Sequence, residues 1–223
     1  METKLKAFFP EKNNYNNFID FLKKNKIKFE AKYEFPEYLI KLNTTTELLG
    51  EIYKEFGEFI FANEDKTLID VFHDTISKTD ITISGAESCT GGLVSKYLTD
   101  RAGASKYFKY SVVSYSNESK IKILNIDKDK IEEKGVVSKA TVIGMLEGLE
   151  YIYPTNIAYA VTGIAGPDGG SIDQPVGTVF IGIVQYGRRD IEKFFFEGNR
   201  WEIRRFSTWT ILLKMLNKIK EDI

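Results

Sequence analysis

The stretch Ile81 to Gly92, ITISGAESCTGG, decides the fold of this chain, because a β-branched run ends there in small and hydroxyl residues. A helical pattern with Leu93, Val94, Tyr97 and Leu98 follows it. The stretch therefore predicts a strand that ends at about Ser84, a tight turn and a helix start. Glycines let a ligand approach the backbone closely, and the first N–H groups of a helix can bind an anion or a developing oxyanion.

An ordinary helix start explains the same residues. Ser88 or Thr90 can cap the helix with its side-chain oxygen, and turns of small residues before helices are common in α/β folds. The stretch matches none of GxGxxG, GxxxxGK[ST] or GxSxG, so the mechanisms of those motifs do not transfer to it. From this stretch alone both interpretations stay open.

Composition limits the class of protein. The 223 residues suffice for one large domain, or for a medium domain with a small one, and 43% hydrophobic with 28% charged residues is typical of soluble globular proteins. The formal net charge of −1 gives no electrostatic case for nucleic acid as a partner. The Met1 start carries no basic segment before an apolar core, and no apolar run nears the roughly 20 residues of a membrane span, so we expect a cytoplasmic protein with no membrane partner.

The single cysteine and the single histidine remove whole classes of chemistry. Cys89 alone excludes an intramolecular disulfide. Every Ser-His-Asp or Cys-His arrangement would have to use His73, which lies in a helical pattern well before the glycine-rich turn. His73 and Cys89 show no zinc-ligand spacing. We therefore expect the base of any enzyme on this chain to be Lys, Tyr, Asp or Glu.

The first 63 residues predict a small α+β domain. The pattern alternates strand-like and helix-like segments in the order βαββαβ, at residues 4–9, 15–24, 28–33, 38–42, 44–56 and 59–61. This order is that of the split βαβ arrangement, with helices on a sheet. Asn63 to Asp65 forms the expected boundary, which gives domains 1–63 and 64–223.

The remaining chain predicts a three-layer α/β/α domain with a mixed sheet, because strands and helices alternate and the last two strands are adjacent. The expected helices cover 67–78, a segment from 93, a segment capped by Ser116 or Asn117, a segment from Ser138, and 200–220. The expected strands cover 81–84, 107–115, 157–161, 176–186 and 191–196, the last two forming a hairpin through Gly187.

Three of these strands end in polar loops, ESCTGG, YSNESK and TGIAGPDGG. Ligands bind at the carboxyl ends of strands in open α/β sheets, so one rim should carry Ser88, Thr90, Tyr115, Asn117, Lys120 and Thr162. Arg200 and Arg204 lie one helical turn apart and can reach an anion. Taken singly, Lys120 fits a solvated helix lysine, the arginines fit a surface face and Thr162 fits a strand end, but together the residues favour a site.

Five ordered segments carry a family resemblance: AESCTGGL (86–93), YSNESK (115–120), GVVS (135–138), TGIAGPDGG (162–170) and PVGTVFIG (175–182). They resemble the C-terminal domain of the CinA family, the nicotinamide mononucleotide amidohydrolases, over about Thr67 to Ile223. Upstream, FGEFIFANEDKTL (56–68) resembles the end of the small KH-like middle domain of full-length members. No segment resembles their larger N-terminal domain, which is associated with pyrophosphatase activity on ADP-ribose, so that activity is not expected here.

The resemblance implies an amidase, a carbon–nitrogen hydrolase acting on a linear amide, that converts nicotinamide mononucleotide to nicotinate mononucleotide and ammonia in pyridine-nucleotide salvage. The family's serine and lysine dyad corresponds to Ser88, which would attack the amide carbon, and Lys120, which would take its proton. Backbone N–H groups near Thr90 to Gly92 would stabilise the oxyanion. The remaining implied site residues are Tyr115 and Thr162 for catalysis, and Thr90, Gly91, Gly92, Asn117, Gly163, Arg200 and Arg204 for substrate, with Arg204 at the phosphate.

The resemblance also implies a homodimer and requires neither a cofactor nor a metal. Gly85 departs from the family, which often has an apolar strand residue there. A second function stays open, that of a catalytically silent member that uses the same pocket to bind a nucleotide or a partner.

Overall fold

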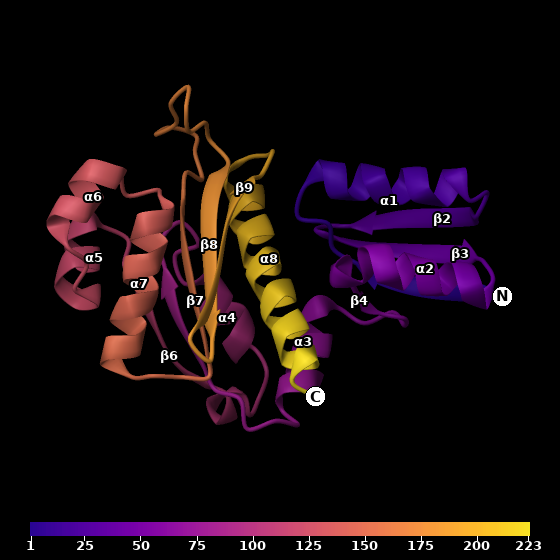
Figure 1. The fold of residues 1–223 in the computed structure, drawn as a ribbon, viewed down its shortest axis with the longest axis horizontal. Helices are drawn as coiled ribbons and strands as arrows, with labels where there is room; N and C mark the ends of the chain where they lie inside the picture. The colour runs from indigo at the N-terminus through magenta and orange to yellow at the C-terminus, as the bar shows by residue number, and fades with distance from the viewer.

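The computed structural model describes all 223 residues and contains two sheets, each with its own core. The small domain lies at one end of the molecule in Figure 1, and the long C-terminal helix α8 (Arg200–Glu221) lies between it and the larger sheet. None of the helices combines the length and apolarity that crossing a membrane requires.

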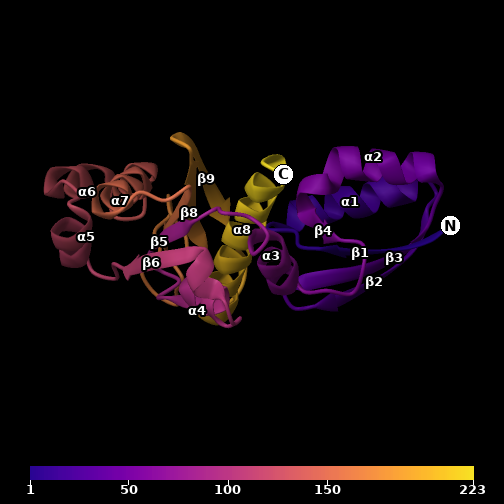
Figure 2. The ribbon, with the colours of Figure 1, turned by 90° about the horizontal axis from the view of Figure 1, so that it is seen from below.

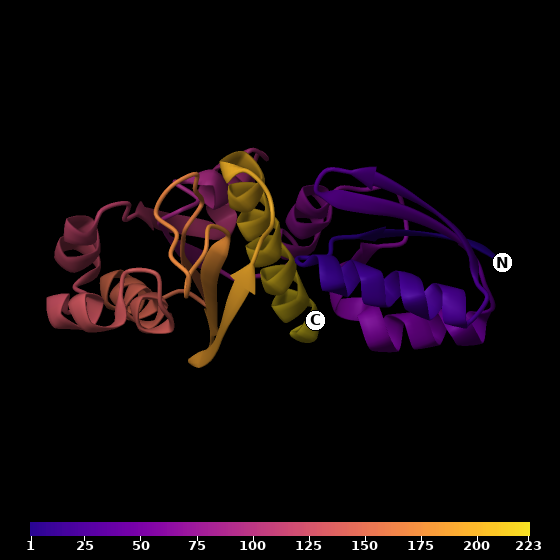
Figure 3. The ribbon, with the colours of Figure 1, turned by 90° about the horizontal axis from the view of Figure 1, so that it is seen from above.

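The small domain has the predicted order βαββαβ. Its elements are β1 (Glu2–Ala7), α1 (Lys12–Lys24), β2 (Lys28–Glu34), β3 (Glu37–Asn43), α2 (Thr46–Phe56), a 3₁₀ turn (Gly57–Phe59) and β4 (Ile60–Ala62). The antiparallel sheet has the order β2-β3-β1-β4, and Figures 2 and 3 show both helices on one of its faces. This is the split βαβ arrangement. Leu5 pairs with Ile40 in the sheet, and both side chains are buried beneath Phe18, Leu22 and Ile52 of the helices.

The larger domain is the predicted three-layer α/β/α domain. Its sheet has the order β6-β5-β7-β8-β9, with β5 (Ile83–Glu87), β6 (Phe108–Val113) and β7 (Ile157–Gly163) parallel, and β8 (Thr178–Gln185) and β9 (Arg188–Phe195) antiparallel. One face packs against α3 (Leu68–Ile76), α4 (Leu93–Thr99) and α8. The other face packs against α5 (Asn117–Leu124), α6 (Lys128–Lys134) and α7 (Lys139–Ile152) (Figure 1).

Two expectations about the larger domain are wrong at the level of single elements. The strand through Ile83 does not end at Ser84: Gly85 and Ala86 belong to β5, because both neighbouring strands pair with this central strand as far as Glu87. The turn therefore begins only at Ser88. The helix α6 is absent from the sequence prediction, since Ile131 is its single buried residue and gives no apolar stripe.

The two domains meet through buried contacts. Phe8 and Phe61 of the small domain belong to the core of the larger one. The buried carboxylate of Glu37 accepts hydrogen bonds from the Leu68 N–H at 3.0 Å and from Trp209 Nε1 at 2.8 Å. It also lies 3.5 Å from the buried ammonium group of Lys6. Burial removes these groups from bulk water, so their mutual contacts favour one relative placement of the two domains.

Candidate active site

A serine and a lysine meet at the carboxyl ends of the parallel strands. Ser88 directly follows β5, and its N–H donates to the Val161 carbonyl at 3.0 Å. Lys120 lies on α5. The side chain of Ser116 caps the start of this helix by accepting a hydrogen bond from the Ser119 N–H, as the sequence predicts. The Nζ atom of Lys120 lies 2.9 Å from Ser88 Oγ. Lys120 is fully buried, so its interpretation as a solvated helix lysine is wrong.

The surroundings of Lys120 favour a neutral amine. Burial lowers the pKa of Lys120 from 10.5 to about 8, and no carboxylate provides a compensating attraction. Lys120 also donates to the Ser114 carbonyl at 2.5 Å. A neutral amine that donates one hydrogen to Ser114 can direct its lone pair at the Ser88 hydroxyl. This is the arrangement that a general base for a serine nucleophile needs.

The neighbouring thiol does not compete for the role of nucleophile. Cys89 is buried, and this burial raises the pKa of its thiol to about 12. The thiolate is the reactive form of cysteine. Cys89 therefore remains protonated near neutral pH, and Ser88 is the nucleophile candidate of this turn.

Glu87 organises the start of α4, and the sequence reasoning missed it. Its carboxylate is fully buried and has no cationic partner. It accepts hydrogen bonds from the N–H groups of Gly92 (2.9 Å), Val94 (3.2 Å) and Ser95 (2.8 Å), from Ser95 Oγ (2.6 Å) and from Tyr159 OH (3.1 Å). The available signal was an acidic residue at the end of an otherwise apolar run, immediately before the serine. Glu87 thus fixes the turn that carries Ser88.

This carboxylate corrects two expectations about the glycine-rich turn. The residue that caps α4 is Gly92, at φ +90°, and neither Ser88 nor Thr90 caps it. The N–H of Gly92 points to Glu87 and that of Gly91 donates to Ser88 O at 3.0 Å, so neither is free for a ligand. The N–H groups of Cys89 and Thr90 donate to no backbone or side-chain oxygen of the chain.

The glycine at position 85 has a steric reason. A Cβ atom on Gly85 would lie 2.1 Å from the ring of Tyr159 on the neighbouring strand, closer than any side chain permits. The ring occupies the space that a side chain would fill, and its hydroxyl reaches Glu87. Gly85 and Tyr159 therefore act together in positioning the turn.

The two arginines of α8 reach the same edge of the sheet. Arg204 donates to the Thr90 carbonyl at 2.6 Å, and its Nε is buried without an acceptor. Arg200 donates to Gly166 O at 2.8 Å and to Tyr115 OH at 2.6 Å. A hollow of about 520 Å³ adjoins them, lined by Ala165, Pro167, Val176, Gly198, Asn199, Arg200, Trp201 and Arg204.

The other predicted site residues are less closely joined to Ser88. Thr162 is buried next to Val161, and its hydroxyl donates to the Val136 carbonyl at 3.0 Å. Asn117 is the exposed first residue of α5, and its side chain makes no hydrogen bond within the chain. A Cβ on Gly163 would lie 2.7 Å from Val179, so close strand packing already requires this glycine. The hydroxyl of Thr90 is buried without a partner.

These observations define the class of protein: an α/β domain with a mixed sheet, in which a buried serine and a buried lysine meet at the ends of the strands. A family model described as the CinA C-terminal domain matches residues 65–219. This chain belongs to the CinA family.

Relatives and solved structures agree with this membership. A CinA-like protein of Fervidobacterium nodosum is 43% identical over 161 residues, which make up 72% of this chain and 40% of that relative. The crystal structure of the competence/damage inducible protein CihA from Agrobacterium tumefaciens is 32% identical with a TM-score of 0.62, over 71% of this chain and 99% of that one. The crystal structure of the competence damage-inducible protein A (ComA) from Klebsiella pneumoniae is 25% identical with a TM-score of 0.65, over 70% of this chain and 98% of that one.

Proposed function

We propose that this protein is an amidohydrolase that converts nicotinamide mononucleotide to nicotinate mononucleotide and ammonia. The observation that carries the proposal is the buried pair of Ser88 Oγ and Lys120 Nζ, 2.9 Å apart, in which burial lowers the pKa of the lysine to about 8. A lysine with that pKa is partly neutral near physiological pH and can accept the proton of a serine.

The proposed reaction has two stages. Ser88 Oγ attacks the carboxamide carbon while Lys120 takes the hydroxyl proton, and the resulting oxyanion accepts hydrogen bonds from the N–H groups of Cys89 and Thr90. The Lys120 ammonium then gives its proton to the leaving nitrogen, and ammonia departs from an acyl-serine. Lys120 then takes a proton from water, whose oxygen attacks the ester carbon, and it returns that proton to Ser88 Oγ as the acyl–oxygen bond breaks and the carboxylate product leaves.

Arg204 and Arg200 are the proposed ligands of the substrate phosphate, because they are the cations beside the hollow at this edge. Tyr115 would hold Arg200 through its hydroxyl, and Thr162 would fix the loop at Val136 behind Ser88. Thr90, Gly91 and Gly92 would shape the turn around the substrate, and Asn117 and Gly163 would form the outer rim. A cytoplasmic homodimer belongs to the same proposal and rests on the family resemblance.

The test is to incubate the protein with nicotinamide mononucleotide and to follow ammonia and nicotinate mononucleotide together. We expect both products in equal amounts, and we expect Ser88→Ala to abolish them. The matched control is Ser105→Ala, at an exposed serine outside the site. Binding of the nucleotide with no ammonia would instead support the catalytically silent member of the family.

A further inference from the structure

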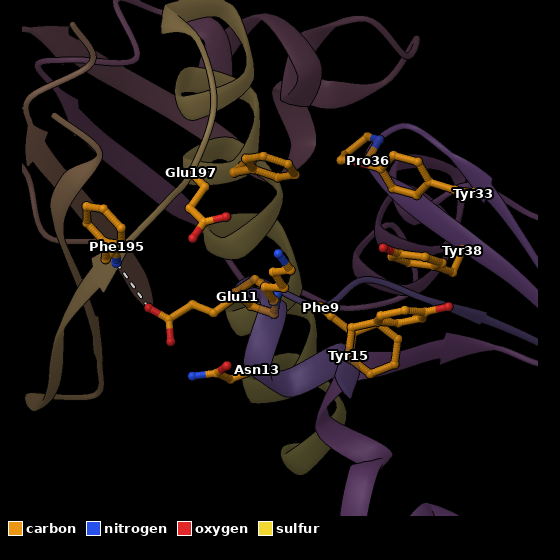
Figure 4. Close-up of a pocket in the computed structure, with 12 residues that line it drawn as sticks. Phe9, Glu11, Asn13, Tyr15, Tyr33, Pro36, Tyr38, Phe195 and Glu197 are labelled. Carbon is orange, nitrogen blue, oxygen red and sulfur yellow. Dashed lines mark hydrogen bonds between the residues drawn. The ribbon is translucent and has the colours of Figure 1, made fainter. Parts of the chain in front are cut away.

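A cavity of about 370 Å³ lies between the two domains (Figure 4), and neither Ser88 nor Lys120 lines it. The start of α1 and the strands β2 and β3 line it from the small domain, and Phe195, Glu197 and Phe206 line it from the larger one. The N–H of Phe195 donates to Glu11 Oε1 at 3.0 Å and joins the two walls. The volume is within the range of small-molecule sites, which occur preferentially at domain interfaces.

The wall of the small domain is a stack of tyrosine rings. Tyr15 stacks on Tyr38 with 4.4 Å between ring centroids, and Tyr38 lies 4.7 Å from Tyr33. Phe9 packs edge-on against Tyr15 and Tyr38. The hydroxyl groups of the three tyrosines make no hydrogen bond within the chain, and burial raises the pKa of Tyr38 to about 12, so its ring stays neutral. Neutral phenol rings have electron-rich faces that attract cations. Because Tyr38 lies between Tyr15 and Tyr33, the faces that a cation can meet are the outer faces of the stack.

The opposite wall supplies negative charge. Figure 4 shows Glu197 and Phe195 across the cavity from the tyrosine rings. The carboxylate of Glu197 forms neither a hydrogen bond nor an ion pair with its own cavity wall, and Glu11 adds a second carboxylate. Lys12 is the single cation of the lining and is exposed. The cavity contains no arginine, so it lacks the usual ligands of phosphate.

We propose that this cavity binds a weakly hydrated organic cation, such as a trimethylammonium or guanidinium group, between the tyrosine stack and Glu197. Aromatic rings with a carboxylate favour such cations over inorganic ones, because a diffuse charge loses little hydration when it is covered. The cation can be part of a free small molecule or of an arginine side chain. The site is independent of the proposed hydrolysis.

The experiment is calorimetric titration of the intact protein with choline and with 3,3-dimethylbutan-1-ol, a neutral molecule of the same shape. We expect choline to bind at least about tenfold more tightly than the alcohol. A parallel titration with N-acetyl-arginine amide distinguishes the two sources of the cation. Tighter binding of choline would favour a free small molecule, and tighter binding of the arginine amide would favour a polypeptide side chain. Equal affinity for choline and the alcohol, or no binding of either cation, would overturn the proposal.

Two variants locate the binding. Tyr33 is about half exposed and Glu197 is exposed, so Tyr33→Leu and Glu197→Gln should fold normally. Each should weaken cation binding by at least about fivefold. The matched controls, Tyr53→Leu on α2 and Glu30→Gln on β2, lie outside the cavity and should bind as the wild type does. Unchanged binding in both cavity variants would place the cation elsewhere, while unchanged binding in Ser88→Ala separates this site from the hydrolase site.

Discussion

Lys120 combines complete burial with the absence of a carboxylate partner. Burying a charged lysine costs stability, and this cost lowers the pKa of its ammonium group. The lysine is therefore partly neutral near physiological pH and can act as a base. We expect kcat/KM to rise about tenfold per pH unit below pH 8 and to level off above it, as a plot of kcat/KM against pH can show.

Lys120→Arg tests whether the lysine must lose its proton. Arginine keeps the charge but cannot act as a base, so this variant should be as inactive as Lys120→Ala at every pH. Steady-state rates of ammonia release are the measurement, and Lys122→Arg, at an exposed lysine on the same helix, should keep full activity. Substantial activity in Lys120→Arg would mean that the residue only holds substrate by its charge.

The same group links stability to pH. The unfolded chain holds the proton of Lys120 up to about pH 10.5, whereas the folded protein loses it near pH 8, so unfolding takes up a proton between these values. The free energy of unfolding should therefore increase as the pH rises through this window, by roughly 3 kcal/mol from this residue. Lys120→Met should remove the increase in denaturant titrations at pH 7 and pH 10, and Lys122→Met should leave it in place.

The helix α4 is the element whose position depends most on a single side chain. Three backbone N–H groups at its start donate to Glu87, because the N-cap residue Gly92 has no side chain that could accept hydrogen bonds. Glu87→Gln puts an amide NH₂ against these donors. We expect a loss of about 1–3 kcal/mol in unfolding free energy and a lower kcat, because the turn that carries Ser88 loosens.

The dependence of kcat/KM on pH in Glu87→Gln shows whether Glu87 acts only by positioning the turn that carries Ser88. Glu87 forms neither a hydrogen bond nor an ion pair with Lys120, so the variant should lower the rate without moving the pH midpoint of about 8. Asp100→Asn, an exposed carboxylate at the other end of α4, is the matched control. A shifted midpoint would mean that Glu87 contributes to the titration of the base.

The helix α8 carries the proposed phosphate ligands. Charge-assisted hydrogen bonds are the strong ones, so nicotinamide riboside, which lacks the phosphate, should have a kcat/KM about 10- to 100-fold lower than the mononucleotide. Arg204→Gln should lower kcat/KM for the mononucleotide toward that for the riboside, and Arg188→Gln on β9 should not. Equal kcat/KM for the two compounds in the wild type would exclude the anion-binding role.

Most elements follow from local patterns, and the failures have local reasons as well. Ser116 and Ser138 cap helices that the sequence predicts to begin there. That Ser88 and Lys120 share one edge of the sheet was predictable, because each follows a strand of a parallel sheet. Their pairing as a dyad was predicted only from the family resemblance. The end of β5 was not predictable, since it depends on strand partners more than 20 residues away, such as Ser111 and Tyr159. The role of Glu87 was missed because its burial follows from that same strand pairing, although its backbone donors lie only five to eight residues along the chain.

The placement of the two domains relative to each other depends on contacts that no local sequence pattern predicts. Glu37 and Trp209 are 172 residues apart and share a buried hydrogen bond. Removing residues 1–63 would leave Trp209 Nε1 and the Leu68 N–H without their acceptor and uncover the ring of Phe206, which Phe35 now covers. The domain boundary predicted at residues 63–64 is thus also a buried interface.

A truncated protein beginning at Glu64 tests the contribution of the small domain. All proposed active-site residues follow Lys78, and solved relatives match about 70% of this chain over nearly their whole length, so the truncated protein should remain active. Its melting temperature should fall, because buried polar groups lose their partners. Glu37→Gln in the full chain is the matched comparison. A folded but inactive truncated protein would show that the small domain contributes to the site.

Both tryptophans of the chain lie at the junction of the two domains. Trp201 stacks on Phe35 of the small domain at 4.8 Å, Trp209 donates to Glu37, and the guanidinium of Arg205 lies over both indole rings. The tryptophan fluorescence of the protein therefore originates at this one junction. A shift in the tryptophan emission maximum will report solvent reaching this junction, so a spectrometer can follow the interface without a dye or a label.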